Sequence, residues 1–353
     1  MEGYINYGKL KNTIELLDNF TGTVEPSYRK LSLYYDNSLK IYASDGCANI
    51  TINFSGDFLP FEGIYTIPVQ YLKGLLKENK NKTDDVVKIS IDEKNLTFEF
   101  REMRFSTSYL KENFNVFPSK NFKILFRTKI SEFTDKIDFT SCAASEGDLI
   151  NIVSKKNKCF FQYNSGYFEA ITFFSESNED FVYSLPYVTV RHILKSFSKI
   201  KKDLILTVGI TKEKLIFYVP GIIVESCFDN EYIFDPGLRK TSYLENQIID
   251  SSYFKNALNK MYTSFSKDNK AHLVLKNSES YIYKEENNTS FSWKIPYSFE
   301  NYYLSNFHIR KIRSLLSRMS EKITLFSGKN YLTFVDEKKH KRFQIPVNEY
   351  KIN

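Results

Sequence analysis

The chain has few of the residues that interrupt or cross-link a small fold. Its 353 residues include 13 glycines, 9 prolines and 4 cysteines. The cysteines lie far apart, with no CxxC pair and no clustered histidines, so neither a zinc site nor a disulfide framework is expected. We expect buried free thiols at all four positions: Cys47, Cys142, Cys159 and Cys227.

The usual sequence signatures of catalysis are also missing. There is no GxxxxGK[ST] loop, no GxGxxG after a strand, no HExxH and no GxSxG. The histidines are scattered, and acidic pairs such as Asp84-Asp85 and Glu285-Glu286 lie in expected turns. These absences favour a protein that is not an enzyme and holds no cofactor or metal. An enzyme whose site is assembled from residues remote in sequence is the alternative.

No run of eighteen apolar residues occurs, and residues 1–4 (MEGY) do not open a signal peptide pattern. We therefore expect an intracellular protein with no membrane partner. With 42% hydrophobic and 26% charged residues, the chain has the composition of a globular protein with two or three domains. The formal net charge of +7 suits a polyanionic partner if the cations gather on one surface.

A repeat of about 118 residues organises the sequence. YTIP at residues 65–68 leads into an amphipathic stretch, and YSLP at residues 183–186 leads into a similar one. YLSN at residues 303–306 is a weaker third copy, with Asn306 in the place of the proline. A pair of expected strands follows each copy: 88–91 with 96–100, 204–208 with 215–219, and 323–326 with 331–334.

Each repeat also begins with an amphipathic stretch that has helical spacing. These stretches cover residues 10–20, 130–139 and 254–265. Each repeat therefore has two halves, and each half is a helix followed by antiparallel strands. The pattern predicts an α+β fold of three tandem domains, with boundaries at 1–121, 122–242 and 243–353.

Cations follow one face of the second helix in each repeat. In the middle repeat they advance by four, four and three residues, away from an apolar face that contains Val190 and Ile193. The first repeat has lysines in the same register, and the third has two arginines at an offset of 119. The predicted DNA-binding residues are Lys73, Lys77, Lys80, Arg191, Lys195, Lys199, Lys202, Arg310 and Arg318.

Cations spaced along helices without aromatic platforms suit contacts with phosphates better than contacts with base edges. No helix-turn-helix, zinc finger or other recognition module accompanies them. The sequence therefore predicts binding to nucleic acid without sequence specificity.

With these repeats, the sequence resembles the beta sliding clamp of bacterial DNA polymerase III over essentially the whole chain. Residues 43–46 (ASDG) are similar to the family's first-domain Ala-Thr-Asp segment. Residues 114–118 (FNVFP) resemble its domain-closing Phe-Pro, and residues 343–347 (FQIPV) resemble its Val-Met-Pro-Met terminus.

The resemblance implies a homodimer whose six domains close head to tail into a ring around double-stranded DNA. It implies a processivity factor that tethers the replicative DNA polymerase and is loaded by a clamp loader. The implied location is the cytoplasm, at the nucleoid; an organelle or the cytoplasm of a phage-infected host would suit the same function. The alternative is a clamp-fold paralogue that acts as a docking hub or as a regulator of replication or transcription without stable DNA encirclement.

Clamps of this family bind partner peptides in a groove between the second and third domains. The family's Thr-Asp-Gly-His is replaced here by Asn-Ser-Gly-Tyr at residues 164–167, so we expect the partner motif to differ. The resemblance implies these groove residues: Ile150, Asn164, Gly166, Tyr167, Pro236, Phe343, Ile345 and Val347.

Overall fold

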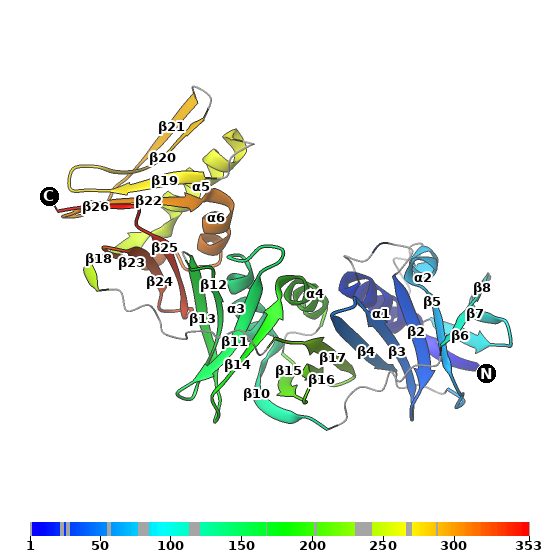
Figure 1. Ribbon diagram of the computed structural model, residues 1–353. Coiled ribbons are helices and arrows are strands. Elements are labelled where there is room, and N and C mark those ends of the chain that lie inside the picture. The colour runs from blue at the N-terminus through cyan, green and yellow to red at the C-terminus, as the bar shows by residue number, and fades with distance from the viewer. Residues whose placement is uncertain are drawn as a thin grey trace. The chain divides into compact units, whose positions relative to one another are not determined.

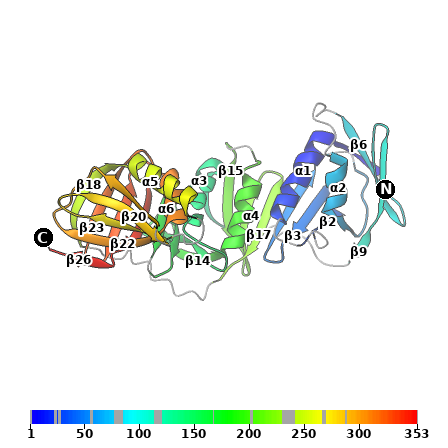
Figure 2. The same ribbon diagram turned by 90° about the horizontal axis from the view of Figure 1, so that it is seen from above.

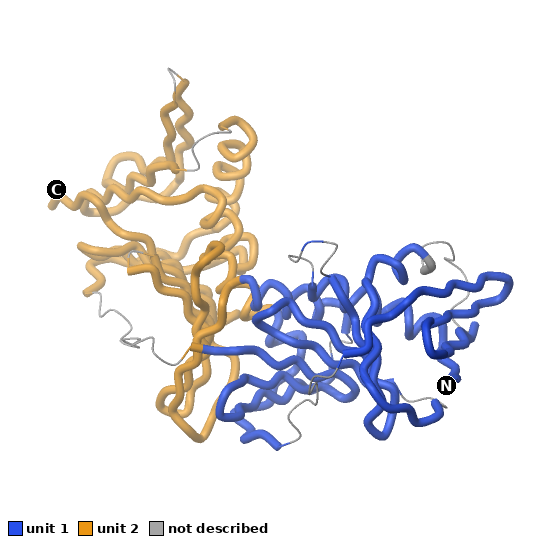
Figure 3. The backbone as a smooth tube through the Cα atoms, turned by 45° about the vertical axis from the view of Figure 1, so that its right-hand side comes forward, with its two compact units in different colours: residues 1–134, 188–228 blue, residues 135–187, 229–353 orange. Residues whose placement is uncertain are grey.

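The computed structural model describes residues 2–21, 25, 29–54, 58–76, 85–112, 121–166, 168–200, 203–229, 242–265, 270–286 and 289–352. These residues group into two compact units (Figure 3). Unit 1 contains residues 1–134 and 188–228, and unit 2 contains residues 135–187 and 229–353.

Unit 1 contains two sheets and the helices packed on them (Figure 1). Its helices are α1 (Tyr7–Phe20), α2 (Val69–Leu76), the start of α3 (Ile130–Ser141) and nearly all of α4 (Tyr187–Phe197). Its strands are β1 (Glu2–Asn6), β2 (Lys30–Tyr35), β3 (Leu39–Ser44), β4 (Ala48–Phe54), β5 (Ile64–Pro68), β6 (Val86–Ile91), β7 (Asn95–Phe100), β8 (Met103–Ser108), β9 (Leu110–Glu112), β10 (Lys123–Lys129), β15 (Ile205–Ile210), β16 (Lys214–Val219) and β17 (Ile222–Cys227).

Unit 2 is built in the same way. Its helices are the rest of α3, α5 (Ser251–Ser264) and α6 (Ile309–Ser317). Its strands are β11 (Leu149–Lys155), β12 (Lys158–Asn164), β13 (Glu169–Glu176), β14 (Phe181–Pro186), β18 (Tyr243–Asp250), β19 (Lys270–Leu275), β20 (Ser280–Glu286), β21 (Thr289–Ile295), β22 (Tyr302–His308), β23 (Lys322–Gly328), β24 (Tyr331–Asp336), β25 (Lys341–Pro346) and β26 (Glu349–Lys351).

Helix α1 illustrates how local sequence sets these elements. The Asn6 side chain accepts a hydrogen bond from the backbone N–H of Lys9 and so caps the first turn. Leu10, Ile14 and Leu17 recur at helical spacing and are all buried. Their apolar face packs on β3 and β4, while α1 lies beside α2 (Figure 2).

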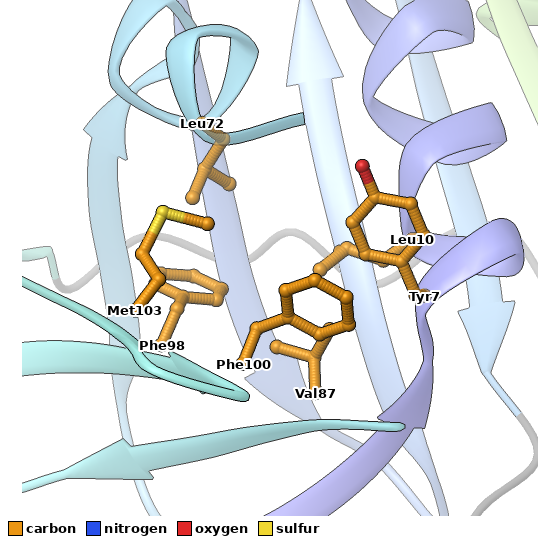
Figure 4. Close-up of a pocket in the computed structure, with 7 residues that line it drawn as sticks. All are labelled: Tyr7, Leu10, Leu72, Val87, Phe98, Phe100 and Met103. Atoms are coloured by element: carbon orange, nitrogen blue, oxygen red, sulfur yellow. The ribbon is translucent and has the colours of Figure 1, made fainter. Parts of the chain in front are cut away.

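Alternating strands complete the core of each unit. Beneath α1 and α2, an apolar cavity of about 20 Å³ is lined by residues from both helices and from the sheet of β6, β7 and β8 (Figure 4). Met103, on β8, points into it from one side and Tyr7, on α1, from the other. A void of this size with an apolar lining offers a water molecule no polar partners, so we expect it to stay dry.

Two antiparallel ladders join strands of successive repeats. In unit 1 the sheet order is β10-β15-β16-β17-β4-β3-β2-β5-β9, and Val224 of β17 pairs with Ile50 of β4. In unit 2 the order is β14-β11-β12-β13-β25-β24-β23-β18, and Phe343 of β25 pairs with Ala170 of β13. We call these the first and second junctions.

Each of the two smaller sheets has, at one edge, a strand that corresponds to a junction strand. One has the order β1-β6-β7-β8, and the other has the order β21-β20-β19-β22-β26. Within the described part of the chain, β8 and β21 therefore pair on one side only. Strand β8 closes the second half of the first repeat, as β17 and β25 close theirs. Strand β21 closes the first half of the third repeat, as β4 and β13 close theirs.

The predicted α+β fold is confirmed, including all three pairs of strands and all three opening helices. The division into domains at residues 121 and 242 stays a prediction. The expectation of four buried thiols was wrong: Cys159 is buried, but Cys142 is partly exposed and Cys47 and Cys227 are exposed. Cys47 lies in the turn before β4 and Cys227 is the last residue of β17, so both side chains lie outside the core.

Two further properties hold for the residues that the structure describes. None of the helices there has the length and apolarity needed to cross a membrane. In the same ranges, no three His, Cys, Asp or Glu side chains gather in a way that could hold a metal ion.

Candidate nucleic-acid interface and partner surface

The second helix of each repeat carries a cation at its fifth residue. Counted from the helix starts, these residues are Lys73 in α2, Arg191 in α4 and Arg313 in α6. The sequence register had paired Arg310 with Arg191, but α6 begins at Ile309, so Arg310 lies in its first turn. Arg313, three residues after Arg310, therefore takes the place that corresponds to Arg191, because β22 continues to His308 and α6 starts later than the sequence register implies.

Lys195 is exposed on α4, Lys199 is exposed in the turn that follows α4, and Arg191 is partly exposed. Lys199 borders a hollow of about 280 Å³ that Lys9 of α1 borders from another repeat. Asn12 and Asn53 add polar groups, and no carboxylate is among the lining residues that the structure describes. A hollow with two cations and no anion can accept a phosphate group. The sequence reading missed Lys9 because it followed only the second helices.

Two predicted cations are instead held by carboxylates. Lys73 lies 2.6 Å from a carboxylate oxygen of Asp18 on α1, and Arg29 also pairs with Asp18. In unit 2, Arg318 pairs with Asp138 of α3 at 2.5 Å and donates to the carbonyl of Ser314. These pairs reduce the positive charge that Lys73 and Arg318 present to solvent.

Arg310 and Arg313 differ in their surroundings. Arg310 is exposed, whereas the guanidinium of Arg313 stacks on Tyr262 of α5, with 3.9 Å between the guanidinium carbon and the ring centroid. Such stacking leaves the cation charged and fixes its place on the helix surface. The remaining predicted cations, Lys77, Lys80 and Lys202, lie outside the described residues.

A buried hydrogen bond between a histidine and a carboxylate supports the first junction on the helix side. The Nδ1 atom of His192 on α4 hydrogen-bonds to Oδ2 of Asp45, in the turn between β3 and β4, and both side chains are almost fully buried. Oδ1 of Asp45 accepts from the backbone N–H groups of Cys47 and Ala48. Burial raises the pKa of Asp45, but the His192 and backbone hydrogen bonds outweigh it and hold the pKa below its ordinary value.

Replacing Asp45 with alanine is expected to lower the free energy of unfolding of unit 1 by about 3 kcal/mol at neutral pH, because His192 is left buried without its acceptor. A carboxyl with a depressed pKa stabilises the fold above its ordinary pKa, so the difference from the unmodified protein should shrink below about pH 4. Urea unfolding between pH 7 and pH 3 measures both effects. Glu99→Gln, which removes an exposed pair with Arg104, is the control and should cost far less. Equal losses in the two variants would contradict the assignment.

The predicted groove residues fall into two groups. Ile150 and Phe343 are fully buried and Ile345 is 1% exposed. Ile150 and Phe343 are three strands apart, about 14 Å, on the same face of the sheet. The ring of Phe343 stacks on Phe334 at 4.5 Å between centroids, and Lys341, two residues away on β25, reaches Asp135 of α3. This face of the sheet therefore looks toward the helices.

The other described groove residues lie at the surface. Asn164 accepts a hydrogen bond from the backbone N–H of Gly166, and Gly166 has a φ of +85°, which a residue with a side chain rarely adopts. Val347 is partly exposed, and its N–H donates to the carbonyl of Asn330 at 2.8 Å. Tyr167 and Pro236 lie outside the described residues.

A buried polar cluster lies beside this loop and was not visible in the sequence. Glu169 accepts from Gln162 at 2.6 Å and from Arg342 at 3.4 Å, and these three residues connect β12, β13 and β25. If the β13–β25 ladder shifted by one residue, the buried carboxylate of Glu169 would lose its hydrogen-bond donors, which costs free energy. This cluster therefore helps to fix the register of the second junction.

Neither a protein-family model nor a curated protein matches the sequence. Solved structures match it closely in shape. The DNA polymerase III subunit beta from Pseudomonas aeruginosa has a TM-score of 0.84 at 14% identity, covering 99% of this chain and 100% of that one. The beta subunit from Thermotoga maritima has a TM-score of 0.81 at 11% identity, covering 99% of both chains.

A third structure, the Helicobacter pylori beta clamp bound to a DNA ligase peptide, has a TM-score of 0.76 at 14% identity, covering 99% of this chain and 100% of that one. In each case the agreement extends over 99% of this chain. This chain has the fold of the beta sliding clamps of DNA polymerase III.

Proposed function

We propose that this protein is a sliding clamp: a homodimeric ring that encircles double-stranded DNA and tethers the replicative polymerase, without catalysing a reaction. The observation that carries the proposal is the repeated junction. Two junctions join three repeats within the chain, and β8 and β21 are left as the matching edges of a third. A second copy supplies the missing partner for each edge, and two chains then close a ring.

The register of this third junction follows from the other two. In each repeat, the residue two positions before the second helix starts a cross-strand row that ends on the junction strand. These rows are Ile67, Leu31, Ala43 and Ile50; Leu185, Ile150, Tyr163 and Ala170; and Phe307, Ala271, Lys284 and Phe291. In each row the step from the second to the third residue continues a ladder by one residue past its last paired residues. Phe291 is therefore the counterpart of Ile50 and Ala170.

The other strand of each junction is β8, β17 or β25. Its register is read from the strand paired with it in the same repeat, which is β7, β16 or β24. The aligned pairs are Phe105 with Phe98, Val224 with Phe217, and Phe343 with Phe334. Because Val224 faces Ile50 and Phe343 faces Ala170, Phe105 should face Phe291 of the second copy. Two residues along, Met103 should face Trp293. Closure would then cover four apolar side chains that are now only partly buried.

Cations on the helix side supply the contact with DNA in this proposal. Lys9, Lys195 and Arg310 are exposed on helices, and Lys199 is exposed just after α4. None of the four is in an ion pair within the part of the chain that the structure describes. Phosphates attract such cations regardless of base sequence. The Lys73 and Arg318 ion pairs favour the alternative of a clamp-fold docking protein with a weaker hold on DNA.

Retention on circular DNA separates the two functions. A closed ring loaded on nicked circular DNA by its clamp loader should stay bound through gel filtration and should be lost when the circle is cut once. A docking protein would elute early whether or not the circle is intact, and that result would reject encirclement.

Partner proteins are proposed to bind near the loop at residues 164–168 and the end of β25. The H. pylori clamp, which has the same fold, was solved with a DNA ligase peptide. Val347 is the partly exposed apolar residue beside this loop, whereas Ile345 belongs to the core. The polymerase and the clamp loader are the proposed partners, in the cytoplasm at the nucleoid and with no cofactor.

Val347→Ala is expected to weaken the binding of a labelled peptide from the cognate polymerase by about tenfold, because short peptides depend on a few apolar contacts. Fluorescence anisotropy measures the change. Val86→Ala, at an exposed position on β6, is the matched control and should leave binding intact. Unchanged affinity in the Val347 variant would place the peptide elsewhere. Ile345→Ala is a poorer test, since a buried truncation costs about 3 kcal/mol of stability by itself.

A further inference from the structure

Two cysteines that are 180 positions apart in the sequence meet at the end of the first junction. The β17–β4 ladder pairs Glu225 with Asn49 and Ser226 with Ala48. Its next rung places Cys227 opposite Cys47, and the N–H of Cys227 donates to the carbonyl of Cys47 at 3.1 Å. Opposite residues of an antiparallel ladder lie on the same face, and both thiols are exposed there.

The separation suits a disulfide. Opposite residues with a ladder hydrogen bond have Cα atoms about 5.5 Å apart, which lies within the range of disulfide-linked cysteines. Their Cβ atoms must come closer by roughly 1 Å, because the usual cross-strand spacing exceeds that of a disulfide. The rung is the last of its ladder, where a small displacement breaks few other contacts. A bond closed with some strain at an exposed place is readily reduced again.

The fold does not require cysteines here. By the row alignment, Cys227 corresponds at the second junction to Pro346. The loop at residues 44–46 (SDG) is the counterpart of residues 164–166 (NSG), and Gly46 and Gly166 both have positive φ. The turn beside the thiol pair at the first junction therefore corresponds to the turn that holds the predicted groove residues Asn164 and Gly166.

We propose that Cys47 and Cys227 form a reversible disulfide that locks the first junction. The oxidant is a low-molecular-weight disulfide such as oxidised glutathione. One cysteine thiolate attacks it, forms a mixed disulfide and releases one thiolate. The thiolate of the second cysteine then attacks the protein sulfur of the mixed disulfide and releases the second small thiol. Two protein thiols lose two electrons and two protons, and the oxidant is reduced to two thiols.

The groups around Cys47 affect how fast this thiol–disulfide exchange occurs and which part of the fold the disulfide would hold. Burial, the Asp45 carboxylate and Cys227 all raise the pKa of the Cys47 thiol, so exchange should quicken as the pH rises. Asp45 also binds the N–H of Cys47 and pairs with His192. The disulfide would therefore hold the same turn that the buried hydrogen bond between His192 and Asp45 holds. The inference does not rest on the proposed function.

The test is oxidation of the full-length protein with oxidised glutathione, followed by peptide mass spectrometry and thermal unfolding. We expect one intramolecular link between the Cys47 and Cys227 peptides, reversed by dithiothreitol, and a rise in Tm of about 5 °C. Cys47→Ser and Cys227→Ser should each abolish both effects and leave a glutathione adduct on the remaining thiol.

Cys159→Ser is the matched control and should still form the link, since Cys159 is buried and its pKa is raised to about 11. Separate glutathione adducts on Cys47 and Cys227 without a link would overturn the proposal. A link between two chains, or one to Cys142, would overturn it as well.

Discussion

Phe105→Asp is expected to convert the dimer into monomers at micromolar concentration, with a dissociation constant raised by about 100-fold or more. In the proposed third junction, Phe105 of one copy lies opposite Phe291 of the other, next to Met103 and Trp293. A carboxylate there would be buried among apolar and aromatic side chains with no cation opposite it. Analytical ultracentrifugation over a range of concentrations measures the shift.

The control lies on the opposite edge of the same sheet. Tyr4 on β1 is 52% exposed, and Tyr4→Asp introduces the same charge on a strand that the proposal leaves outside the junction. It should remain dimeric. If both variants stay dimeric, β8 is not a junction strand; if both dissociate, the effect comes from the net charge.

Engineered cysteines test the register itself. In a variant without Cys47 and Cys227, Phe105→Cys combined with Phe291→Cys should form a disulfide between chains, because directly opposite residues are within reach. Phe105→Cys combined with Trp293→Cys should not, since diagonal neighbours are about 7–8 Å apart. The reverse outcome would mean that the third junction has a different register from the first two.

The helices and strands could be predicted from the sequence because their signals are local. Leu10, Ile14 and Leu17 show the helical period, and the buried face of α1 uses these residues. The repeat supplied the rest of the fold, since a pattern that occurs three times is hard to produce by chance. The start of α6 was not predicted correctly: β22 continues to His308, so Arg313 takes the position that had been given to Arg310.

The pairs that define the junctions could not be predicted, because they depend on which strands become neighbours. Asp45 meets His192 across 147 positions, and Glu169 meets Arg342 across 173. Asp45 stands in the segment at residues 43–46, but nothing in that segment points to His192, and Glu169 stands in no motif. Cys47 and Cys227 show the same difficulty: their distance in sequence argued against any relation between them.

The candidate DNA-binding residues could likewise be predicted only in part from the sequence. A cation on an exposed helix face can be read from periodicity, but its pairing cannot. Lys73 and Arg318 have the same sequence pattern as Lys195 and Lys199, yet carboxylates of other helices hold them. Lys9 lay in a helix with only a weak basic pattern and became relevant when the fold brought it to the hollow beside Lys199.

Reversing the charge of this pair, Lys9→Glu with Lys199→Glu, is expected to lower the affinity for short duplex DNA by about tenfold or more at moderate salt. Each phosphate contact that is lost removes the release of about one counterion, so the salt dependence should also become shallower, by about 1 in the logarithmic slope per contact. Fluorescence anisotropy with two duplexes of unrelated sequence, over a range of salt concentrations, measures both quantities.

The control must change the net charge equally on another surface. Lys88 lies on the outer face of β6 and Lys94 in the turn that follows, and Lys88→Glu with Lys94→Glu makes the same change in charge. If affinity falls equally in both double variants, only the overall charge matters and the hollow has no special role. If affinity falls for one duplex and not the other, the helices read bases, which a clamp that slides over every sequence cannot do.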